Sequence, residues 1–280
     1  RKWGYEIKKI PHNDAKIIFV EGNFWGRTLA AISSSTDPTS TKGFGPFMPG
    51  YEIIPYNDIN SLKNALKDPN VAAFMVEPIQ GEAGVIVPDD EYLPKVSELC
   101  KKHNILLAMD EVQTGFGRTG ADFAHQLFGV KPDIMGCGKA AGGGILPISF
   151  VAGKDEVIKT LTPGSEGSTF GGYPLASVVG VYAVKTIIDQ NLAQNARIRG
   201  TQLMQHYLEL KDDYGDTVLL DAIITKKMEI IEHLINAGAN INIKDANGQT
   251  PLHIACVDKN SDLVKLLIEK GADLEIIDND

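Results

Sequence analysis

Long apolar runs, paired cysteines and a basic excess are all absent from this sequence of 280 residues. No apolar stretch approaches the roughly 18–20 residues of a membrane span, so we expect no membrane segment. The three cysteines, Cys100, Cys137 and Cys256, show neither paired spacing nor a metal-ligand pattern. This cysteine usage favours a reducing, intracellular setting and predicts no metal site.

The net charge of −9 is distributed unevenly along the chain. Residues 212–280 hold 14 acids and 6 lysines, whereas residues 1–211 hold 22 acids and 21 bases. The acidic surplus therefore belongs to the C-terminal segment, where it argues against nucleic-acid binding. An apolar content of 43% and a charged content of 22% are typical of a globular protein with an ordinary core.

Up to about residue 211, short apolar runs alternate with longer amphipathic stretches. Helical spacing predicts helices over 58–67, 91–103 and 174–190. The predicted strands are 16–20, 71–76, 105–109, 133–135 and 148–152. Strands that are apolar throughout and separated by helices indicate an α/β fold with a mainly parallel sheet covered on both faces.

After about residue 211 the sequence repeats itself with a period of 33 residues. Residues 215–222 are echoed by 248–255, and residues 231–240 by 264–273. This period and the Thr-Pro-Leu-His phrase at 250–253 resemble ankyrin repeats.

Local chemistry supports the repeat assignment. Thr250 can cap a helix that begins at Pro251. Gly238 and Gly271 stand where a left-handed helix end requires glycine. We therefore predict an all-α segment over 212–280, with repeats at about 215–247 and 248–280.

Two residues of the first segment suggest a pyridoxal-phosphate site. Asp110 follows one buried strand, and Lys139 lies in a glycine-rich turn after a later strand. A lysine amine can hold an aldehyde cofactor as a Schiff base, and a carboxylate can keep the cofactor's ring nitrogen protonated. Open parallel sheets bind ligands beyond the carboxyl ends of their strands, which favours a site here. A solvated surface lysine and an acid that caps the next helix are the alternatives.

The first segment also carries a family resemblance over about residues 1–210. The phrases that carry it are Gly22–Thr28, Ser33–Pro38, Phe44–Gly50, Val76–Gly84, Asp110–Gly115 and Gly167–Gly172. They resemble the ornithine aminotransferases, which are class III, fold-type I pyridoxal-phosphate enzymes. The resemblance implies a pyridoxal-phosphate-binding large domain over residues 1–211, followed by the repeats over 212–280.

The resemblance implies roles for residues at the cofactor. Lys139 would hold the cofactor and shuttle a proton, and Asp110 would pair with the ring nitrogen. Phe24 would stack on the ring, and Gln113 would hydrogen-bond its phenolic oxygen. A core phenylalanine and a surface glutamine are the plainer alternatives for these last two.

Further residues are implied in substrate and phosphate binding. Arg27 would clamp a substrate carboxylate with its planar guanidinium, and Trp25 and Glu82 would line the substrate site. Ser168 and Thr169 would bind the cofactor, with Thr169 at the phosphate of the neighbouring subunit. A surface salt bridge for Arg27, a turn position for Glu82 and a helix N-cap for Thr169 are the alternatives.

The implied activity moves the δ-amino group of ornithine to 2-oxoglutarate and gives glutamate-5-semialdehyde, in a homodimer. The alternative is a protein that binds a partner through its ankyrin repeats and keeps an inactive aminotransferase remnant. The family pattern places the phosphate-binding turn in a segment expected upstream of Arg1, and a small domain where the repeats stand. The cytoplasm is the expected compartment and the mitochondrion the alternative, because the deciding segment is also expected upstream.

Overall fold

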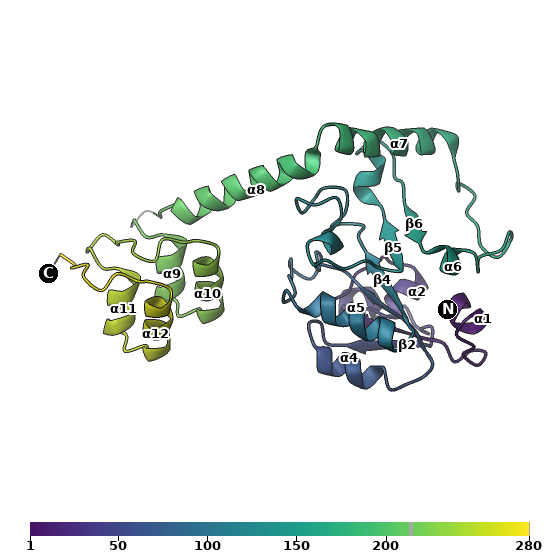
Figure 1. Cartoon of the computed structure of the whole chain (residues 1–280), viewed down its shortest axis with the longest axis horizontal. Helices are drawn as coiled ribbons and strands as arrows, with labels where there is room; N and C mark the ends of the chain where they lie inside the picture. The colour runs from purple at the N-terminus through teal and green to yellow at the C-terminus, as the bar shows by residue number, and fades with distance from the viewer. Residues whose placement is uncertain (213–214, 280) are drawn as a thin grey trace. The chain divides into compact units, whose positions relative to one another are not determined.

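The computed structural model describes residues 1–212 and 215–279, which divide into two compact units (Figure 1). The first unit is Arg1–Arg197 and the second is Ile198–Asp280. The expected boundary between residues 211 and 212 stays a prediction. Asp280, at the end of the predicted second repeat, lies outside the described residues.

A six-stranded sheet forms the centre of the first unit, in the order β2-β1-β3-β4-β5-β6. Every pair of neighbours is parallel except β5 and β6, which are antiparallel. The strands are β1 (Lys16–Val20), β2 (Tyr51–Ile54), β3 (Val71–Val76), β4 (Leu106–Asp110), β5 (Ile134–Cys137) and β6 (Phe150–Gly153). The predicted parallel α/β sheet is confirmed, and five of its strands lie where the apolar runs indicated.

Only β2 was missed. It lies at the edge of the sheet and pairs with β1 alone. Strand β2 has one neighbour and mostly half-exposed side chains, so it tolerates a polar residue such as Glu52. Its sequence is therefore not a continuous apolar run. Edge strands are therefore the hardest to find from apolar runs.

The main core lies on one face of the sheet, beneath α4 (Ile59–Ala65) and α5 (Tyr92–Lys102). Alternate strand residues point into it. The sheet contributes Ile18, Val20, Phe74, Val76, Leu107 and Met109, and the helices contribute Leu62, Leu93, Val96 and Cys100. A smaller cluster on the other face gathers Trp3 of α1 (Lys2–Glu6) with Ala73, Leu106 and Val157.

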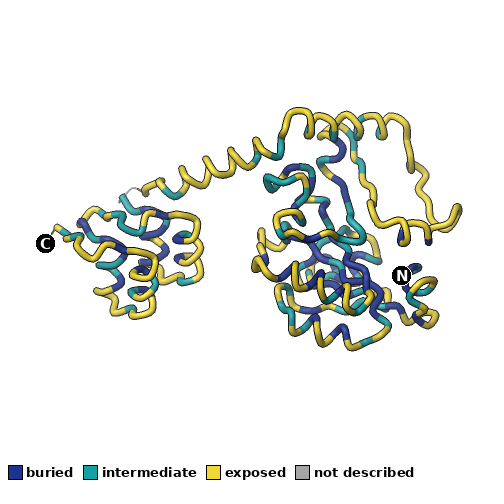
Figure 2. Tube along the Cα trace, in the orientation of Figure 1, coloured by how far each residue is buried: buried dark blue, intermediate teal, exposed yellow. Residues whose placement is uncertain are grey.

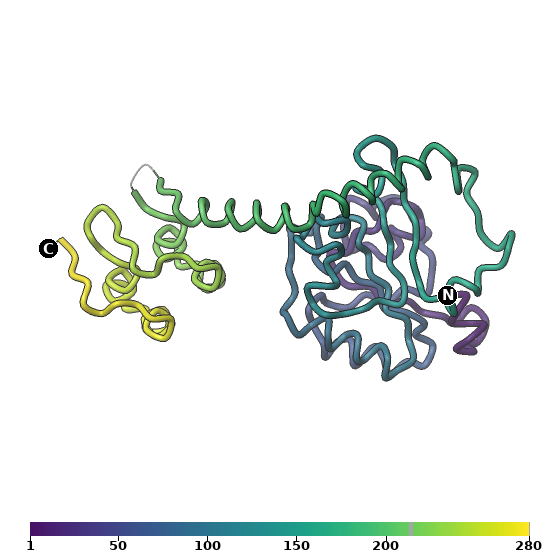
Figure 3. The backbone as a smooth tube through the Cα atoms, turned by 45° about the horizontal axis from the view of Figure 1, so that its top comes forward, coloured from purple at the N-terminus to yellow at the C-terminus, as the bar shows by residue number. Residues whose placement is uncertain are grey.

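Short helices connect the strands. They are α2 (Leu29–Ile32), α3 (Pro38–Thr41), α6 (Asp155–Ile158) and the 3-10 helices η1 (Ala124–Gln126) and η2 (Lys139–Gly142). An open segment then leads from α6 to α7 (Pro174–Asp189), as Figures 1 and 3 show. Helix α7 packs on η2.

None of the 16 residues of α7 is buried, and none of the 18 of α8 (Leu192–Glu209), so both helices are exposed nearly throughout in Figure 2. The exposed side chains of α7 include Leu175, Val178, Val181, Tyr182 and Ile188. An apolar helix without a buried residue is a surface that another element can cover.

Two helix pairs form the second unit. They are α9 (Val218–Ile224) with α10 (Met228–Asn236), and α11 (Pro251–Val257) with α12 (Ser261–Glu269). Helices α9 and α11 begin 33 residues apart, and so do α10 and α12, as the sequence period requires. Gly238 and Gly271 have φ of 95° and 90°, which confirms the predicted left-handed helix ends. Among the described residues, no helix combines the length and apolar character that crossing a membrane needs.

The two repeats differ at their first caps. Thr250 Oγ1 lies 2.8 Å from His253 Nδ1, and the backbone N–H of Thr250 donates to the same ring nitrogen at 3.1 Å. In the first repeat Leu220 stands in place of the histidine, and the buried Thr217 Oγ1 has no hydrogen-bond partner among the described residues. The missing histidine explains the orphaned hydroxyl.

Replacing each cap threonine by valine tests this difference. Thr250→Val should lower the unfolding free energy of the repeat unit by about 1 kcal/mol, because it removes a working cap. Thr217→Val, the matched control, should be neutral or stabilising, because it removes a buried hydroxyl that is not satisfied. Hydrogen exchange of the α9 to α12 amides measures both, and equal losses in the two variants would contradict the assignment.

Candidate active site

The carboxyl ends of the four parallel strands β1, β3, β4 and β5 meet at one edge of the sheet. Phe24 follows β1, Glu77 follows β3, Asp110 ends β4 and Lys139 follows β5. Three of these residues, Phe24, Glu77 and Asp110, line one small recess together with Asn23 and Trp25. The sheet therefore gathers side chains that lie up to 115 residues apart in the sequence.

Asp110 is half-buried at the end of β4. Its Oδ1 accepts a hydrogen bond from Val112 N at 2.9 Å, and Oδ2 has no hydrogen-bond partner within the described part of the chain. Burial raises the pKa of Asp110, while the hydrogen bond from Val112 and the charge of Lys139 oppose the rise. The carboxylate thus has a free oxygen in a poorly solvated place, where it would attract a cationic or N–H group.

Glu77 is an acid of this site to which the sequence analysis assigned no role. It is buried, and its Oε1 accepts a hydrogen bond from Phe24 N at 3.0 Å. Burial raises the pKa of Glu77 to about 7, and the neighbouring charge of Asp110 adds to the rise. Its position directly after a buried strand could have identified Glu77, because a similar position identified Asp110.

Lys139 begins η2 with an exposed side chain. Its φ is 44°, in the left-handed region that side chains other than glycine rarely adopt. Such backbone strain costs of order 1 kcal/mol and is concentrated at functional sites. The positive charge of the Lys139 ammonium group opposes the rise that burial causes in the pKa of Asp110 and of Glu77.

The turn after β1 holds three predicted site residues. The ring of Phe24 lies under the Arg27 guanidinium, with Cζ 5.6 Å from the ring centroid. Arg27 is exposed. Trp25 is held inward, because its Nε1 donates to Ser34 Oγ at 2.7 Å and its ring stacks on Phe19 at 5.2 Å. Trp25 therefore shapes the wall of the recess, while Arg27 is the residue of this turn that reaches solvent.

Gln113 lies against the turn that follows Glu77. A Cβ on Gly81 would come within 1.7 Å of Gln113 Oε1, so a larger residue there would displace the end of the Gln113 side chain. Gln113 lies over this turn and is exposed. Glu82, the next residue, is exposed as well.

Ser168 and Thr169 lie apart from the recess residues. Both are exposed in the segment between α6 and α7. Ser168 lines a groove of about 750 Å³ against α7, together with Phe170, Tyr173 and Lys185. The structure of one chain therefore does not bring these two residues to Asp110, and their predicted role stays a prediction.

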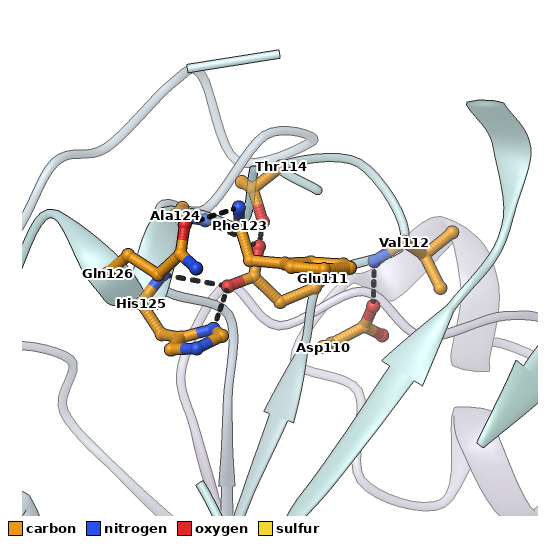
Figure 4. A network of polar contacts seen from close by, with 8 residues as sticks. All are labelled: Asp110, Glu111, Val112, Thr114, Phe123, Ala124, His125 and Gln126. Carbon is orange, nitrogen blue, oxygen red and sulfur yellow. Dashed lines mark hydrogen bonds and ion pairs between the residues drawn. The ribbon is translucent and has the colours of Figure 1, made fainter. Parts of the chain in front are cut away.

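A buried acid network next to Asp110 was not predicted (Figure 4). Glu111 is 0% exposed and accepts four hydrogen bonds. The donors are Thr114 Oγ1 at 2.5 Å, Ala124 N at 3.0 Å, His125 N at 2.8 Å and His125 Nδ1 at 2.9 Å. One carboxylate therefore ties the loop that carries Gln113 to η1. Because donors within the chain occupy both carboxylate oxygens, Glu111 has a structural role and is not available to bind a cofactor or substrate.

Comparisons with known proteins agree with this geometry. The family model for class III aminotransferases matches residues 1–220, and the ankyrin-repeat model matches residues 214–246 and 247–279. The mitochondrial ornithine aminotransferase of Rattus norvegicus is 52% identical over 231 residues, which are 81% of this chain and 53% of the rat protein. Ornithine aminotransferase of Plasmodium falciparum isolate 3D7 is 53% identical over 213 residues, covering 76% of this chain and 51% of that protein.

A solved structure shows the same relation. The crystal structure of ornithine aminotransferase from Toxoplasma gondii ME49 matches with a TM-score of 0.72 and 50% identity, over 74% of this chain and 49% of that chain. The chain thus spans about half the length of the relatives it matches. The predicted fold class and the family resemblance are confirmed.

The raised pKa of Glu77 predicts how stability depends on pH. A carboxyl group whose folded pKa is raised stabilises the fold below its unfolded pKa of about 4.5, and this contribution is lost as the pH rises through about 7. Between pH 5 and pH 8, Glu77 should therefore cost the first unit about 3 kcal/mol of unfolding free energy.

Glu77→Gln should remove most of this fall, because the amide does not ionise. Urea unfolding followed by tryptophan fluorescence measures it, since both tryptophans, Trp3 and Trp25, lie in the first unit. Glu82→Gln, an exposed change in the same turn, is the control and should keep the pH dependence of the natural chain. The assignment is wrong if Glu77→Gln keeps it too.

Proposed function

We propose that this chain, which belongs to the class III aminotransferase family, transfers the δ-amino group of ornithine to 2-oxoglutarate with pyridoxal phosphate. The product from ornithine would be glutamate-5-semialdehyde. The observation that carries the proposal is that Phe24 and Asp110 line one recess at the carboxyl ends of the strands, where Lys139 follows β5. Relatives that are about half identical to this chain bear the name ornithine aminotransferase.

The residues present fit the ring of this cofactor. The free Oδ2 of half-buried Asp110 suits a protonated pyridine nitrogen, whose N–H would donate a hydrogen bond to it. The Phe24 ring offers an aromatic face in the same recess. The Lys139 amine, within electrostatic reach of Asp110, suits the aldehyde.

When bound, pyridoxal phosphate supplies an electron sink that stabilises negative charge at the substrate carbon beside the reacting nitrogen. Asp110 would hold the proton on the ring nitrogen, because a charged carboxylate in a poorly solvated place favours a cationic neighbour. The Nζ atom of Lys139 would accept a proton from this substrate carbon and then donate it to a neighbouring atom. Glu77 would support both by holding Phe24 through its backbone N–H.

The remaining site residues are assigned by the resemblance. Arg27 is exposed beside Phe24 and suits a substrate carboxylate. Gln113, which lies over Gly81, would contact the phenolic oxygen, and Glu82 would lie at the substrate. Ser168 and Thr169 would bind the cofactor, with Thr169 at the phosphate of the cofactor in a neighbouring subunit, which is consistent with its position outside the recess of one chain.

A homodimer is part of the proposal. The exposed apolar side chains of α7 and the groove beside Ser168 offer a surface that a second copy would cover. We propose the cytoplasm as the location, although the rat relative is named as mitochondrial. Small-molecule substrates and the absence of a nucleic-acid partner also belong to the proposal.

For the C-terminal unit we propose protein binding, the usual role of a repeat array. Its match to the ankyrin-repeat model and its exposed apolar residues support this role. If the first unit proves inactive, protein binding becomes the main function of the chain.

Borohydride reduction tests the cofactor site. The chain with added pyridoxal phosphate should show a visible absorption band, and reduction should fix the cofactor on the peptide that carries Lys139. Lys139→Ala should lose both, whereas Lys131→Ala, an exposed lysine in the same unit, should keep both. Asp110→Asn should weaken cofactor binding by about 10- to 100-fold, because a charge-assisted hydrogen bond is lost. Label spread over many lysines would contradict the proposal.

Charged substitution on α7 tests the dimer. Val181→Lys should convert a dimer to a monomer, because it puts a charge on a surface that the dimer would bury. Val85→Lys, which changes an even more exposed apolar residue of the same unit outside α7 and the groove, is the control. Sedimentation velocity gives the mass, and a monomeric natural chain would rule the proposed dimer out.

A further inference from the structure

The turn that follows β4, Asp110–Gly115, carries two side chains that the proposed function uses at the cofactor. Asp110 Oδ1 accepts a hydrogen bond from Val112 N at 2.9 Å, so the orientation of this carboxylate depends on where the turn lies. Gln113 is the next residue of the turn. A Cβ on Gly138 would come within 3.2 Å of Val112 Cγ1, so the turn also lies against the segment before the candidate lysine. A displacement of the turn would therefore move both side chains.

The backbone of the turn is compact and rests on the segment before η1. Gly115 N donates to Glu111 O at 2.9 Å, which closes the turn on itself. A Cβ on Gly115 would lie 2.8 Å from Glu111 O and 2.9 Å from Phe123 Cδ1, so the chain passes close to both. The turn can therefore move as one piece, and its place depends on what holds it to η1.

The Glu111 side chain supplies that connection (Figure 4). Its Oε2 accepts hydrogen bonds from Thr114 Oγ1 and Ala124 N, and its Oε1 accepts from His125 N and His125 Nδ1. Three of these four donors belong to η1. Two of the three are backbone N–H groups, which almost any residue provides. His125 Nδ1 is the donor that depends on which side chain stands there.

The His125 ring is well placed to hold the carboxylate. An ionised carboxylate only accepts hydrogen bonds, so Nδ1 carries the hydrogen and donates it to Glu111 Oε1 at 2.9 Å. The His125 side chain is 13% exposed and that of Glu111 is 0% exposed. The ring also stacks on Phe123, with centroids 5.9 Å apart and planes 21° from parallel. A hydrogen bond to a charged acceptor that is shielded from water is stronger than one between neutral groups.

We propose that His125 is a positioning residue for the transamination. Through Glu111, it holds the turn and thereby orients Asp110 and Gln113 toward the cofactor. His125 is not among the residues that line the recess around Asp110, so it acts through the turn and not on the reacting atoms. The chemical consequence rests on the proposed function, whereas the hold on the turn can be measured without any cofactor.

Hydrogen exchange of the Val112 amide, in the chain without added cofactor, measures this hold. His125→Leu should speed the exchange about tenfold, because the turn opens more often when a donor to Glu111 is lost. His125→Asn should leave the exchange within about twofold of the natural rate, since its side-chain amide can place an N–H where Nδ1 donates. His12→Leu, a change at an exposed histidine of the same unit, is the control and should have no effect.

The location of the effect separates a positioning role from a general one. Exchange that rises equally at Val112 and throughout β3 would mean that His125 only stabilises the unit, and the inference would be overturned. Unchanged exchange of Val112 in His125→Leu would overturn it as well. Should His125→Leu fail to fold, His125→Gln replaces it, because its amide lies one bond further from the backbone and should lose the contact that His125→Asn keeps.

The coupling between His125 and Glu111 has its own test. In a chain that already carries Glu111→Gln, His125→Leu should cause little further increase in the exchange of Val112, because the carboxylate through which it acts is gone. If His125→Leu speeds the exchange equally in both backgrounds, His125 acts by another route and the assignment is wrong.

Cofactor binding and turnover measure the chemical consequence. His125→Leu should bind pyridoxal phosphate about fivefold more weakly and lower kcat with ornithine about fivefold, because Asp110 and Gln113 are held less firmly. The KM for ornithine should stay within about twofold, since the residue acts on the cofactor side. His125→Asn should restore binding and kcat, and a change in KM alone would overturn the inference. A natural chain that binds no pyridoxal phosphate would instead refute the proposed function, while the exchange of Val112 would still decide whether His125 holds the turn.

Discussion

The parallel direction of β1, β3, β4 and β5 is the constraint on which the candidate site depends. Parallel neighbours require crossover connections, so every one of these strands ends at the same edge of the sheet. Residues that follow the strands meet there whatever their distance in the sequence. Phe24, Glu77 and Asp110 line one recess for this reason, and Lys139 follows the next strand at the same end of the sheet. Burial at this end raises the pKa values of Glu77 and Asp110.

Three acids at this edge show how burial separates structural from functional groups. Glu111 is the most deeply buried, yet four donors satisfy it, and it anchors a loop. Asp110 accepts one hydrogen bond and keeps an oxygen free, so it can take a ligand. Glu77 lies between them: Phe24 N donates to it, but burial still raises its pKa to about 7. The number of donors sets Glu111 apart from the other two acids, each of which accepts one of the hydrogen bonds given above.

The sequence predicted those features of the fold that depend only on short stretches of the chain. Apolar runs located the central strands, and the 33-residue period located the repeats and their glycine ends. The acid that follows β4 was predicted from its place, whereas Glu77 was missed although it has the same place after β3. The Glu111 network and the contact of Gln113 with Gly81 were not predictable, because their partners come from separate loops. Ser168 and Thr169 depend on an interface, which the sequence of one chain does not describe.

The 33-residue period of the second unit has a physical consequence that the sheet of the first unit lacks. In a stacked array, the face that one repeat offers to the next is copied into every repeat, so the last repeat offers it too. Repeat 2 keeps apolar residues at Leu252, Val257 and Ile268, where repeat 1 has Leu219, Ile224 and Ile235. The shared apolar positions give both repeats the same pair of helices. Single differences then decide local detail, because His253 takes part in the cap at Thr250, whereas Leu220 leaves the buried hydroxyl of Thr217 without a partner among the described residues.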